Sequence, residues 1–503
     1  MNFKELNMPM LRKMISLALL SIASFAFADP DPLTLWVMPN GVSPQETLEQ
    51  RLEQFTQQTG IPTQIQILDW REAWNRIANK ENLPVVLQLG TTWIPYFASL
   101  HQIKPLTPWL DKIDSNRFAP VSWNTTHIDS DSIIYSIPWF IDVRALLANK
   151  RILQKNKINK EDLTTYDGFV SAIRKINNSK DFLENGVKIR GFAIPGKSDW
   201  NIPHNFAPWI WSNGGDFLAK DSLGKWHANI LNEKTLTGIA KYLSFVLDSL
   251  VPTDMIQTNT AEVAQSFNAG ELAFIVNTAE IITQTRFEGE KGGLSNAQIG
   301  SDGVAVLPFP MGNEGSINFI GGSNLAIPAT NNRPEALDLL LFLTNDETQD
   351  IYTKQIGFLP TSKDILKKRA EDEDYIQLIK ALETGKTYTT IPEWGVIEQD
   401  LVAMFSAIWE HLEIPALYSE DKIYQIFSTH TQAIDKQLGY TATGAMTFAE
   451  FQEIWHKNII SNQDESSSIR ENEYVSENLR KAPWVFIVMV FLGFLFSLKR
   501  KKK

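Results

Sequence analysis

The alternation of strand and helix patterns between residues 33 and 89 constrains the fold more than any other feature of this sequence. Apolar runs and apolar–polar alternation predict three short strands, and apolar residues at helical spacing predict two helices between them. In chain order these are a strand at 33–38, a helix through Leu48, Leu52 and Phe55, a strand through Ile65 and Ile67, a helix through Ala73, Trp74 and Ile77, and a strand at 85–89. Ser43 begins a capping-box pattern, and Gly60 is expected to end the first helix. This order is typical of an α/β protein with a parallel sheet.

The same pattern returns in the second part of the chain. Strands are predicted at 272–276, 304–307 and 325–327, followed by a helix at about 334–343. From Ala370 onward the pattern is mainly helical.

Residues that follow the predicted strands are candidate binding residues, because open parallel sheets bind ligands beyond the carboxyl ends of their strands. These residues combine tryptophan rings with amide, hydroxyl and carboxylate groups, which can stack on a sugar ring and bind its hydroxyls. The candidates are Asn40, Asp69, Trp70, Thr92, Trp93, Glu280, Gly322 and Ser323. Turn chemistry and packing at the rim of the sheet would explain the same residues without a ligand.

Composition and charge exclude several classes of function. The absence of cysteine excludes disulfides, thiolate metal sites, cysteine nucleophiles and a lipid-modified cysteine. Between residues 29 and 480 the chain has 38 basic and 57 acidic residues, a net charge of −19, which disfavours nucleic-acid binding. No histidine pair has the spacing of a metalloprotease helix, and no G-x-S-x-G elbow occurs. No metal or cofactor is expected, but plentiful carboxylates leave a paired-acid glycosidase open as an alternative.

Both ends of the chain are predicted to be membrane-directed segments. Residues 1–28 combine a basic start, an apolar run and small residues at the end, as in a cleaved secretory signal. Residues 483–498 carry no charge and precede a basic tail at 499–503, which predicts one transmembrane helix with a cytoplasmic tail. Residues 441–482 are expected to form a helical extension and a polar linker. The body is therefore expected outside the cytoplasmic membrane, anchored by its carboxyl-terminal helix.

One short motif, taken alone, would indicate nucleotide binding. Residues 191–198 (GFAIPGKS) match the phosphate-binding loop pattern, in which the glycine–lysine pair opens a helix. Pro203 would interrupt the second turn of such a helix, and an exported domain meets little ATP. The segment is predicted to be a plain loop without a nucleotide.

Several segments, in order, resemble one known family over residues 33–438. They are LPVVLQLGTTWIPYFASLHQIKPL at 83–106, IIYSIPWFIDVRALLANK at 133–150, TTYDGFVSAIRKI at 164–176, WIWSNGGDFL at 209–218, FNAGELAFIVN at 267–277, GGSNLAIP at 321–328 with RPEALDLLLFLT after it, and IGFLPTS at 356–362. This set resembles the extracytoplasmic solute-binding proteins of ABC importers, in the branch that binds maltose, trehalose and related sugars.

The resemblance implies a two-lobed α/β periplasmic-binding-protein fold of type II-like topology, with a hinge between lobes made of discontinuous chain. The implied division assigns residues 29–140 and 275–330 to the first lobe, and residues 141–274 and 331–440 to the second. It also implies a non-enzymatic mechanism, in which a sugar closes the lobes and the closed form docks on the permease subunits of an ABC transporter.

The resemblance also implies ligand contacts. Thr92 and Trp93 match the family's third-strand turn, and Asp142 matches a carboxylate that binds sugar hydroxyls. The remaining candidates in the cleft are Trp139, Arg144, Trp211 and Trp394. Arg144 could instead form a salt bridge between the lobes.

Three features depart from the family. Val85 stands where many relatives have aspartate, Glu280 stands where they stack a sugar on tryptophan, and the predicted anchor is at the carboxyl end. The second departure replaces an aromatic surface with a hydrogen-bond acceptor. A sensory binding subunit that signals to a membrane partner is the principal alternative function, and a saccharide-acting enzyme is a further one.

Overall fold

The computed structural model describes residues 31–459, apart from 197, 198, 200, 288–292, 294–298, 300–302, 415–417, 443 and 445. The predicted signal peptide at 1–28, the predicted transmembrane helix at 483–498 and the tail at 499–503 lie outside the described residues. Among the described helices, none has the length and apolar character needed to cross a bilayer.

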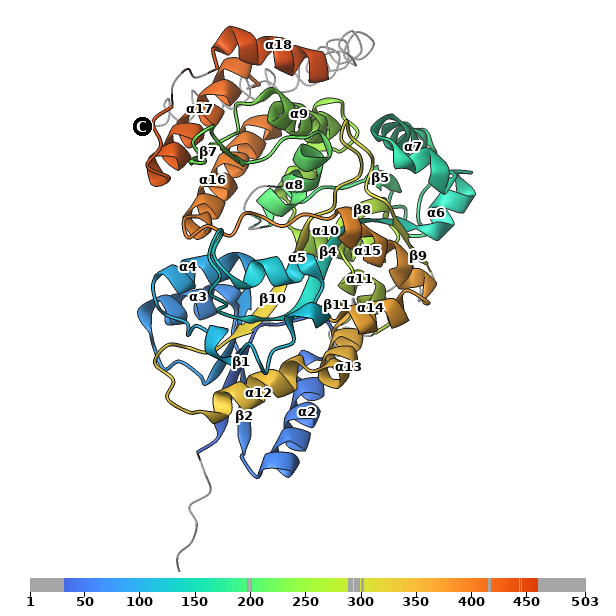
Figure 1. The fold of residues 1–503 in the computed structure, drawn as a ribbon. Helices are drawn as coiled ribbons and strands as arrows, with labels where there is room; N and C mark the ends of the chain where they lie inside the picture. The colour runs from blue at the N-terminus through green and yellow to red at the C-terminus, as the bar shows by residue number, and fades with distance from the viewer. Residues whose placement is uncertain are drawn as a thin grey trace, which may run out of the picture.

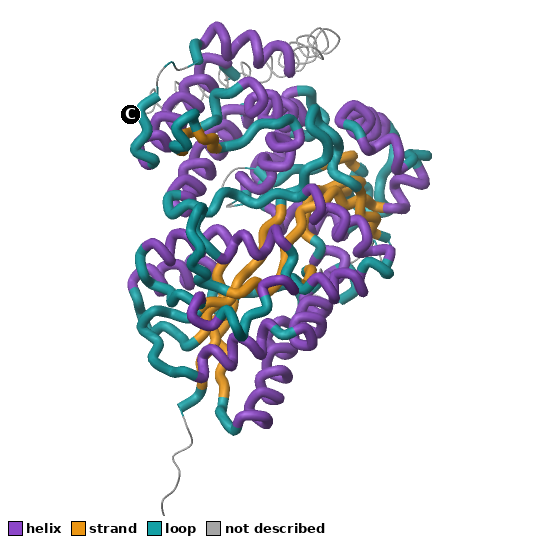
Figure 2. Tube along the Cα trace, viewed as in Figure 1, coloured by secondary structure: helices purple, strands orange, loops and turns teal. Residues whose placement is uncertain are grey.

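The strands form one large mixed sheet and a small hairpin. The strands are β1 (Leu33–Val37), β2 (Thr63–Ile67), β3 (Val86–Gly90), β4 (Ile137–Asn149), β5 (Arg190–Phe192), β6 (Leu218–Lys220), β7 (Trp226–Ala228), β8 (Leu272–Thr278), β9 (Val304–Leu307), β10 (Ile320–Ala326) and β11 (Leu359–Pro360). The large sheet has the order β2-β1-β3-β10-β4-β8-β5, and β9 and β11 also pair with β4. β1 is parallel to β2 and β3, whereas β10 is antiparallel to β3 and β4. Figure 2 shows the strands of the large sheet as one band with helices around it, and the β6–β7 hairpin apart from it.

Seventeen α-helices are described. They are α2 (Pro44–Thr59), α3 (Trp70–Asn79), α4 (Ile94–Ser99), α5 (Pro120–Trp123), α6 (Lys150–Lys155), α7 (Tyr166–Asn178), α8 (Ile202–Ser212), α9 (Glu233–Leu247), α10 (Thr260–Asn268), α11 (Glu280–Gln284), α12 (Glu335–Thr344), α13 (Asp346–Ile356), α14 (Lys363–Arg369), α15 (Glu373–Thr384), α16 (Trp394–Glu413), α17 (Glu420–Gln437) and α18 (Phe448–Ile459). The predicted order of strands and helices at the amino end is confirmed by β1, α2, β2, α3 and β3.

One detail of the first helix differs from prediction. Gly60 ends α2 with φ 74°, as expected for a glycine that caps a helix, and its N–H donates a hydrogen bond to the carbonyl oxygen of Thr56. Ser43 does not form the predicted capping box, because its backbone is left-handed (φ 46°) and its side chain makes no cap hydrogen bond. The helix starts instead with Pro44, which is favourable in a first turn.

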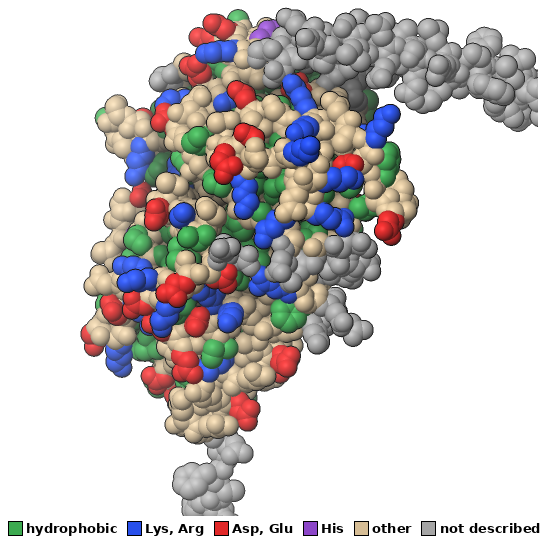
Figure 3. Space-filling view, turned by 90° about the vertical axis from the view of Figure 1, so that its right-hand side faces the viewer, with side chains coloured by type: hydrophobic (Ala, Val, Ile, Leu, Met, Phe, Trp, Pro, Cys, Tyr) green, Lys and Arg blue, Asp and Glu red, His purple; other side chains and the backbone are tan. Residues whose placement is uncertain are grey.

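Two large cores divide the molecule into two lobes, which β4 connects (Figure 1). The first-lobe core packs β1, β3 and α2 together with α12 and α13. The second-lobe core packs α7, α8 and α9 together with α16, α17 and α18. With 13 residues, β4 is long enough to enter both cores. Its amino-terminal part lies in the first-lobe core and its carboxyl-terminal part in the second-lobe core. Charged side chains of both signs are interspersed over one face of the molecule (Figure 3).

The packing corrects the predicted lobe boundaries. Residues 331–440 were expected in the second lobe, but Leu337 and Leu340 of α12 and Tyr352 of α13 are buried in the first-lobe core. Conversely, β9 was expected in the first lobe, but it pairs with the last residues of β4, and Leu307 joins the second-lobe core. The physical reason is that an apolar helix face must be buried against another element, but its sequence does not specify which face of which sheet that element provides.

Candidate functional site

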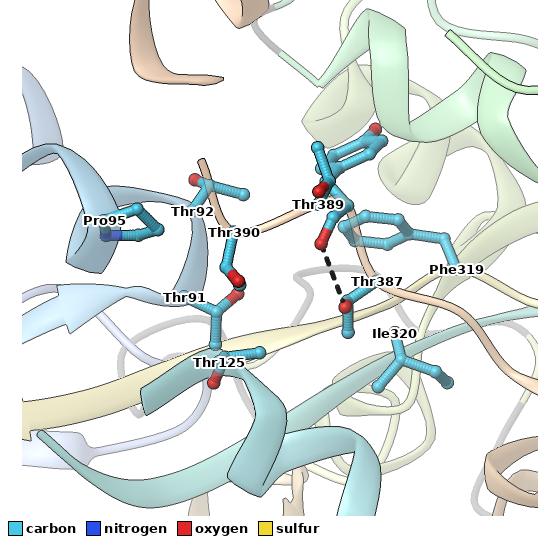
Figure 4. Close-up of a pocket in the computed structure, with 10 residues that line it drawn as sticks. Thr91, Thr92, Pro95, Thr125, Phe319, Ile320, Thr387, Thr389 and Thr390 are labelled. Atoms are coloured by element: carbon cyan, nitrogen blue, oxygen red, sulfur yellow. Dashed lines mark hydrogen bonds between the residues drawn. The ribbon is translucent and has the colours of Figure 1, made fainter. Parts of the chain in front are cut away.

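A small pocket lies between the lobes, directly after the end of β3 (Figure 4). Its lining consists mainly of hydroxyl and aromatic side chains. These are Thr91, Thr92, Pro95, Thr125, Phe319, Ile320, Thr387, Tyr388, Thr389 and Thr390. The enclosed space is about 10 Å³, which is room for about one water molecule. A disaccharide could therefore occupy this place only if the two lobes moved apart.

Four half-buried rings, the aromatic group, lie on the first-lobe side next to this pocket. They are Trp70, Trp74, Trp93 and Tyr96. The ring of Trp93 contacts Trp70 and Trp74 edge-on, with centroids 5.3 and 5.0 Å away, and Trp74 stacks on Tyr96 at 5.0 Å. Because each ring is only partly covered, the aromatic group offers apolar surface on which a sugar ring can stack. The structure thus brings together the predicted residues Trp70, Thr92 and Trp93.

The first turn of α16 approaches the aromatic group from the second lobe. A Cβ atom added at Gly395 would lie 3.3 Å from the ring of Trp74, so the helix backbone is close to this ring. One turn later, Glu398 accepts a hydrogen bond from Thr92 of the first lobe. The carboxylate is 5% exposed, and this burial raises the pKa of Glu398 to about 7. A titratable group therefore lies at the contact between the lobes.

The pH dependence of stability should reflect Glu398. Its pKa is higher in the folded protein than the ordinary value of 4.5, so its stabilising contribution is complete below pH 4.5 and is lost as the pH rises through about 7. For a group shifted this far, the loss is at most about 3 kcal/mol. Urea unfolding across this range should show a shallower pH dependence in Glu398→Gln than in wild type. Glu410→Gln, at an exposed position on the same helix, is the control, and an unchanged pH profile in Glu398→Gln would contradict the assignment.

Strand β4, which connects the lobes, carries the predicted residues Asp142 and Arg144. Asp142 is half-buried on β4 and pairs in register with Gly321 of β10. Burial raises the pKa of Asp142, and Arg144 opposes this effect. The Arg144 guanidinium donates hydrogen bonds to Asn205 Oδ1 (3.1 Å) and Asn201 Oδ1 (2.7 Å) at the start of α8. Arg144 is 3% exposed, and within the described residues it forms no salt bridge between the lobes.

Glu280 is the first residue of α11. It is half-buried, and burial together with the charge of Asp142 raises the pKa of Glu280 to about 7. Thr278 donates a hydrogen bond to its carboxylate, which partly opposes the shift. The pKa of one predicted carboxylate, Glu280, thus responds to the charge of another, Asp142.

Trp139 was predicted to line the cleft, and this prediction is wrong. Its side chain has no exposed surface and stacks on Tyr352 at 4.7 Å within the first-lobe core. A ring enclosed by core residues cannot stack on a sugar without unfolding its surroundings. Helix α13, which covers it, comes from a distant part of the sequence, so the local pattern gave no sign of this burial.

Asn40 and Ser323 lie in a buried polar network behind the strand ends. Asn40 Nδ2 donates to Gln88 Oε1 (2.9 Å) and to the Tyr352 hydroxyl (3.1 Å), and Gln88 Nε2 donates to Ser323 Oγ (2.8 Å). Asn40 is 4% exposed and Ser323 is 1% exposed. The structure therefore does not bring these two candidates to the pocket, and their contacts account for them as internal structure.

Asp69 and Gly322 are explained by backbone geometry. The exposed Asp69 accepts a hydrogen bond from the N–H of Arg71 and caps α3. Gly322 has φ 135°, and a Cβ atom there would lie 2.2 Å from the carbonyl oxygen of Phe140, so no other residue fits.

Trp211 and Trp394 support the pocket from behind rather than lining it. Trp211 is 1% exposed, donates from Nε1 to Asp216 Oδ1 (3.0 Å), and stacks on Phe319 with centroids 6.1 Å apart. Trp394 is 2% exposed and stacks on Tyr388 at 4.3 Å. Each of these buried rings holds one of the aromatic residues of the pocket in place.

The segment 191–198, which matches a phosphate-binding loop, is described as far as Gly196. Helix α8 begins at Ile202, several residues after Gly196. A Cβ atom at Gly196 would lie 1.9 Å from the carbonyl oxygen of Ile256, so this glycine permits a close approach of two backbones. Lys197 and Ser198 lie outside the described residues.

A second, wider groove lies beside α5, α14 and α15, and none of the predicted binding residues lines it. Its volume is about 680 Å³, and its charged lining residues are Lys363, Glu383 and Lys386. It shares only Thr387 with the pocket between the lobes.

Several pocket residues were missed by the sequence analysis. They are Thr125, Phe319, Tyr388, Thr389, Thr390 and, at the contact between the lobes, Glu398. The run Thr387–Thr390 could have been recognised as a candidate binding segment, because three threonines and a tyrosine precede a proline-containing turn. Glu398 carries none, because it is one of many acidic residues in a helical region.

Comparisons with known proteins agree with this architecture. Residues 50–398 match the family model described as "Bacterial extracellular solute-binding protein". The chain is 24% identical over 375 residues to the diacetylchitobiose binding protein DasA of Streptomyces coelicolor. The aligned region covers 74% of this chain and 82% of DasA. Among solved structures, it is similar to maltose-bound MalE3 of T. maritima, with a TM-score of 0.66, 22% identity, and coverage of 80% of this chain and 99% of MalE3.

A second solved structure is similar to the same extent. A solute-binding protein of Thermotoga lettingae bound with alpha-D-tagatose matches with a TM-score of 0.68 and 19% identity, covering 81% of this chain and all of that one (100%). At identities this low, the similarity to solved structures shows a shared fold and nothing more. The match to the family model covers most of the chain and shows the family. The chain thus has the α/β fold of periplasmic binding proteins, and it belongs to the bacterial extracellular solute-binding protein family, whose members bind solutes rather than catalyse reactions.

Proposed function

We propose that this protein binds a sugar or oligosaccharide between its two lobes and delivers it to an ABC importer. The protein is a member of a solute-binding family, and similar proteins are named for diacetylchitobiose, maltose and tagatose. One relative, from Deinococcus radiodurans, is named as a probable ABC transporter-binding protein. These names support a sugar ligand and a transporter partner for this chain.

The observation that carries the proposal is the aromatic group beside the hydroxyl-lined pocket. Trp70 and Trp93 supply half-buried ring surface, and Thr92 is one of the threonines that line the neighbouring pocket. Ring surface with a few fixed polar groups is the combination that recognises a sugar, whose faces are apolar and whose edges carry hydroxyls.

A saccharide should raise the thermal stability of the full-length protein in detergent. A ligand that binds only the folded state at a hundred times its Kd stabilises that state by about 2.7 kcal/mol, which is a rise of a few degrees in Tm. A screen of mono- and disaccharides with amino acids as controls tests this expectation. Stabilisation by amino acids but by no saccharide would contradict the proposed ligand class.

We further propose that the body is anchored by the carboxyl-terminal segment 483–498, with residues 499–503 in the cytoplasm. The support is the uncharged segment and its basic flank in the sequence. A reporter fused after Lys503 should be active in the cytoplasm and inactive outside it, and the reverse result would contradict this topology. Co-purification from membranes should recover transporter subunits; recovery of a sensor protein instead would favour the sensory alternative.

A further inference from the structure

Two further segments cross between the lobes beside β4. The first is β10, because Phe319, directly before it, packs in the second-lobe core and Leu325 packs in the first-lobe core. The second is the segment 385–393, which joins α15 to α16. Its Lys386 N–H donates to Asn318 O (3.0 Å), and the Ile320 N–H donates to Lys386 O (2.8 Å). The three crossing segments are therefore hydrogen-bonded side by side, which is the arrangement of a hinge about which two lobes rotate.

On one side of the crossing segments the lobes are in close contact. Helix α16 of the second lobe meets α4 of the first lobe, and both helices lie at the left edge of the molecule in Figure 1. A Cβ atom at Gly395 would lie 3.3 Å from the ring of Trp74, and the pocket on this side has room for about 10 Å³. The ligand side of the hinge is thus shut in this conformation.

On the other side of the crossing segments the wider groove of about 680 Å³ separates the lobes, and we name it the hinge groove. One wall is α5, whose Trp123 packs against the first-lobe core. The other wall is α15, whose Tyr375 and Leu378 pack in one cluster with Val304 of β9, a strand of the second lobe. In Figure 1, α14 and α15 lie toward the right edge, away from α4 and α16. The apolar residues that line the hinge groove are Ala119, Pro120, Val121, Leu366, Ile379 and Leu382.

The pocket and the hinge groove meet at the crossing segments. Thr387 lines both spaces, and on the first-lobe side Thr125 lines the pocket while its neighbour Asn124 lines the groove. A rotation about the crossing segments that moves α16 away from α4 consequently moves α15 toward α5. The pocket and the hinge groove therefore change width in opposite directions.

We infer that the hinge groove sets the balance between open and closed lobes, so that a bulkier side chain within it favours the closed form. Val121, Ile379 and Leu382 are only partly buried when the groove is wide. Opening of the ligand side narrows the groove and removes this apolar surface from water, which stabilises the open form. A large ring in the groove prevents that approach of α5 and α15, whereas the closed form has room for it.

Tryptophan substitutions on opposite walls of the hinge groove, Val121→Trp and Leu382→Trp, test the inference in the full-length protein. Spin labels at Leu100→Cys and Leu223→Cys report the distance between the lobes, and no saccharide is added. Each tryptophan should shift the distance distribution toward shorter values and raise the ratio of closed to open lobes at least about fivefold, because overpacking of the narrowed groove penalises the open form. The two substitutions should act alike, although they lie on different lobes.

Ile351→Trp is the matched control. Ile351 lies on α13 of the first lobe, is 42% exposed and does not line the hinge groove, so this substitution should leave the distribution as in wild type. The Tm of each variant shows that it is folded, and if one tryptophan variant does not fold, the other decides. An unchanged or longer distance in a folded tryptophan variant would overturn the inference.

The inference and the proposed function fail separately, because the first measurement needs no ligand. Saturating maltose or N,N′-diacetylchitobiose should then shorten the distance in wild type and change it less in the tryptophan variants, whose lobes are already closed. If neither saccharide changed the wild-type distance, the proposed closure on a sugar would be contradicted, while the distances without saccharide would still decide the role of the hinge groove.

Discussion

Replacing Trp139 with alanine is expected to destabilise the protein by about 3–5 kcal/mol and to leave the affinity of the folded fraction unchanged. Trp139 has no exposed surface, and it packs on Phe140 and Tyr352 in the first-lobe core. Removing a ring of this size from a closed core leaves a cavity that its neighbours fill only in part.

Urea unfolding followed by fluorescence, with ligand titration of the same sample, measures both quantities. Trp139→Phe is the matched variant, because it keeps an aromatic ring in the core and should recover most of the stability. A Trp139→Ala protein of normal stability and weakened saccharide binding would show that the ring contacts ligand after all.

Replacing Trp93 with alanine is expected to give the opposite result, a tenfold to hundredfold loss of saccharide affinity with little change in Tm. The ring is half-buried, and it contacts Trp70 and Trp74 at the edge of the proposed binding space. Stacking a sugar on such a ring is worth about 1.5–3 kcal/mol, and about 1.4 kcal/mol corresponds to a factor of ten.

The two measurements for Trp93→Ala are the dissociation constant of the best saccharide and the Tm without ligand. Trp226→Ala, a substitution of a partly exposed tryptophan on the β6–β7 hairpin of the second lobe, is the control and should keep wild-type affinity. Wild-type affinity in Trp93→Ala would remove this ring from the binding site.

The order of strands and helices could be predicted from the sequence because each element carries its own periodicity. The strands β1, β2 and β3 and the helix α12 were all visible as apolar patterns. Their assembly was less visible. α12 and α13 return to the first lobe although they follow elements of the second, and periodicity does not encode which core an apolar face joins.

The candidate site was predictable where its residues follow strands directly. Trp70, Thr92 and Trp93 gather because parallel strands end at one edge of the sheet. The same rule failed for Asn40, which is also close to a strand end but turns into the interior to meet Tyr352. The position of a residue after a strand predicts which edge of the sheet it lies at. It does not predict whether the residue is buried, because burial depends on helices from distant parts of the chain.

The second-lobe side of the site could not be predicted. Tyr388 lies in the segment before α16. Glu398 lies in α16 itself, just over 300 residues after Thr92, the residue that Glu398 contacts. Contacts of this kind arise from the crossing of the chain between lobes, and no local pattern specifies them.

The most direct test of the central claim is the distance between the lobes as a function of ligand. The chain has no cysteine, so Leu100→Cys in the first lobe and Leu223→Cys in the second can be labelled without background. Both positions are exposed, at 45% and 90% respectively. Pulsed electron paramagnetic resonance should then report a shorter and narrower distance distribution as a saccharide saturates the protein. An identical distribution with and without saturating saccharide would contradict binding by closure of the two lobes.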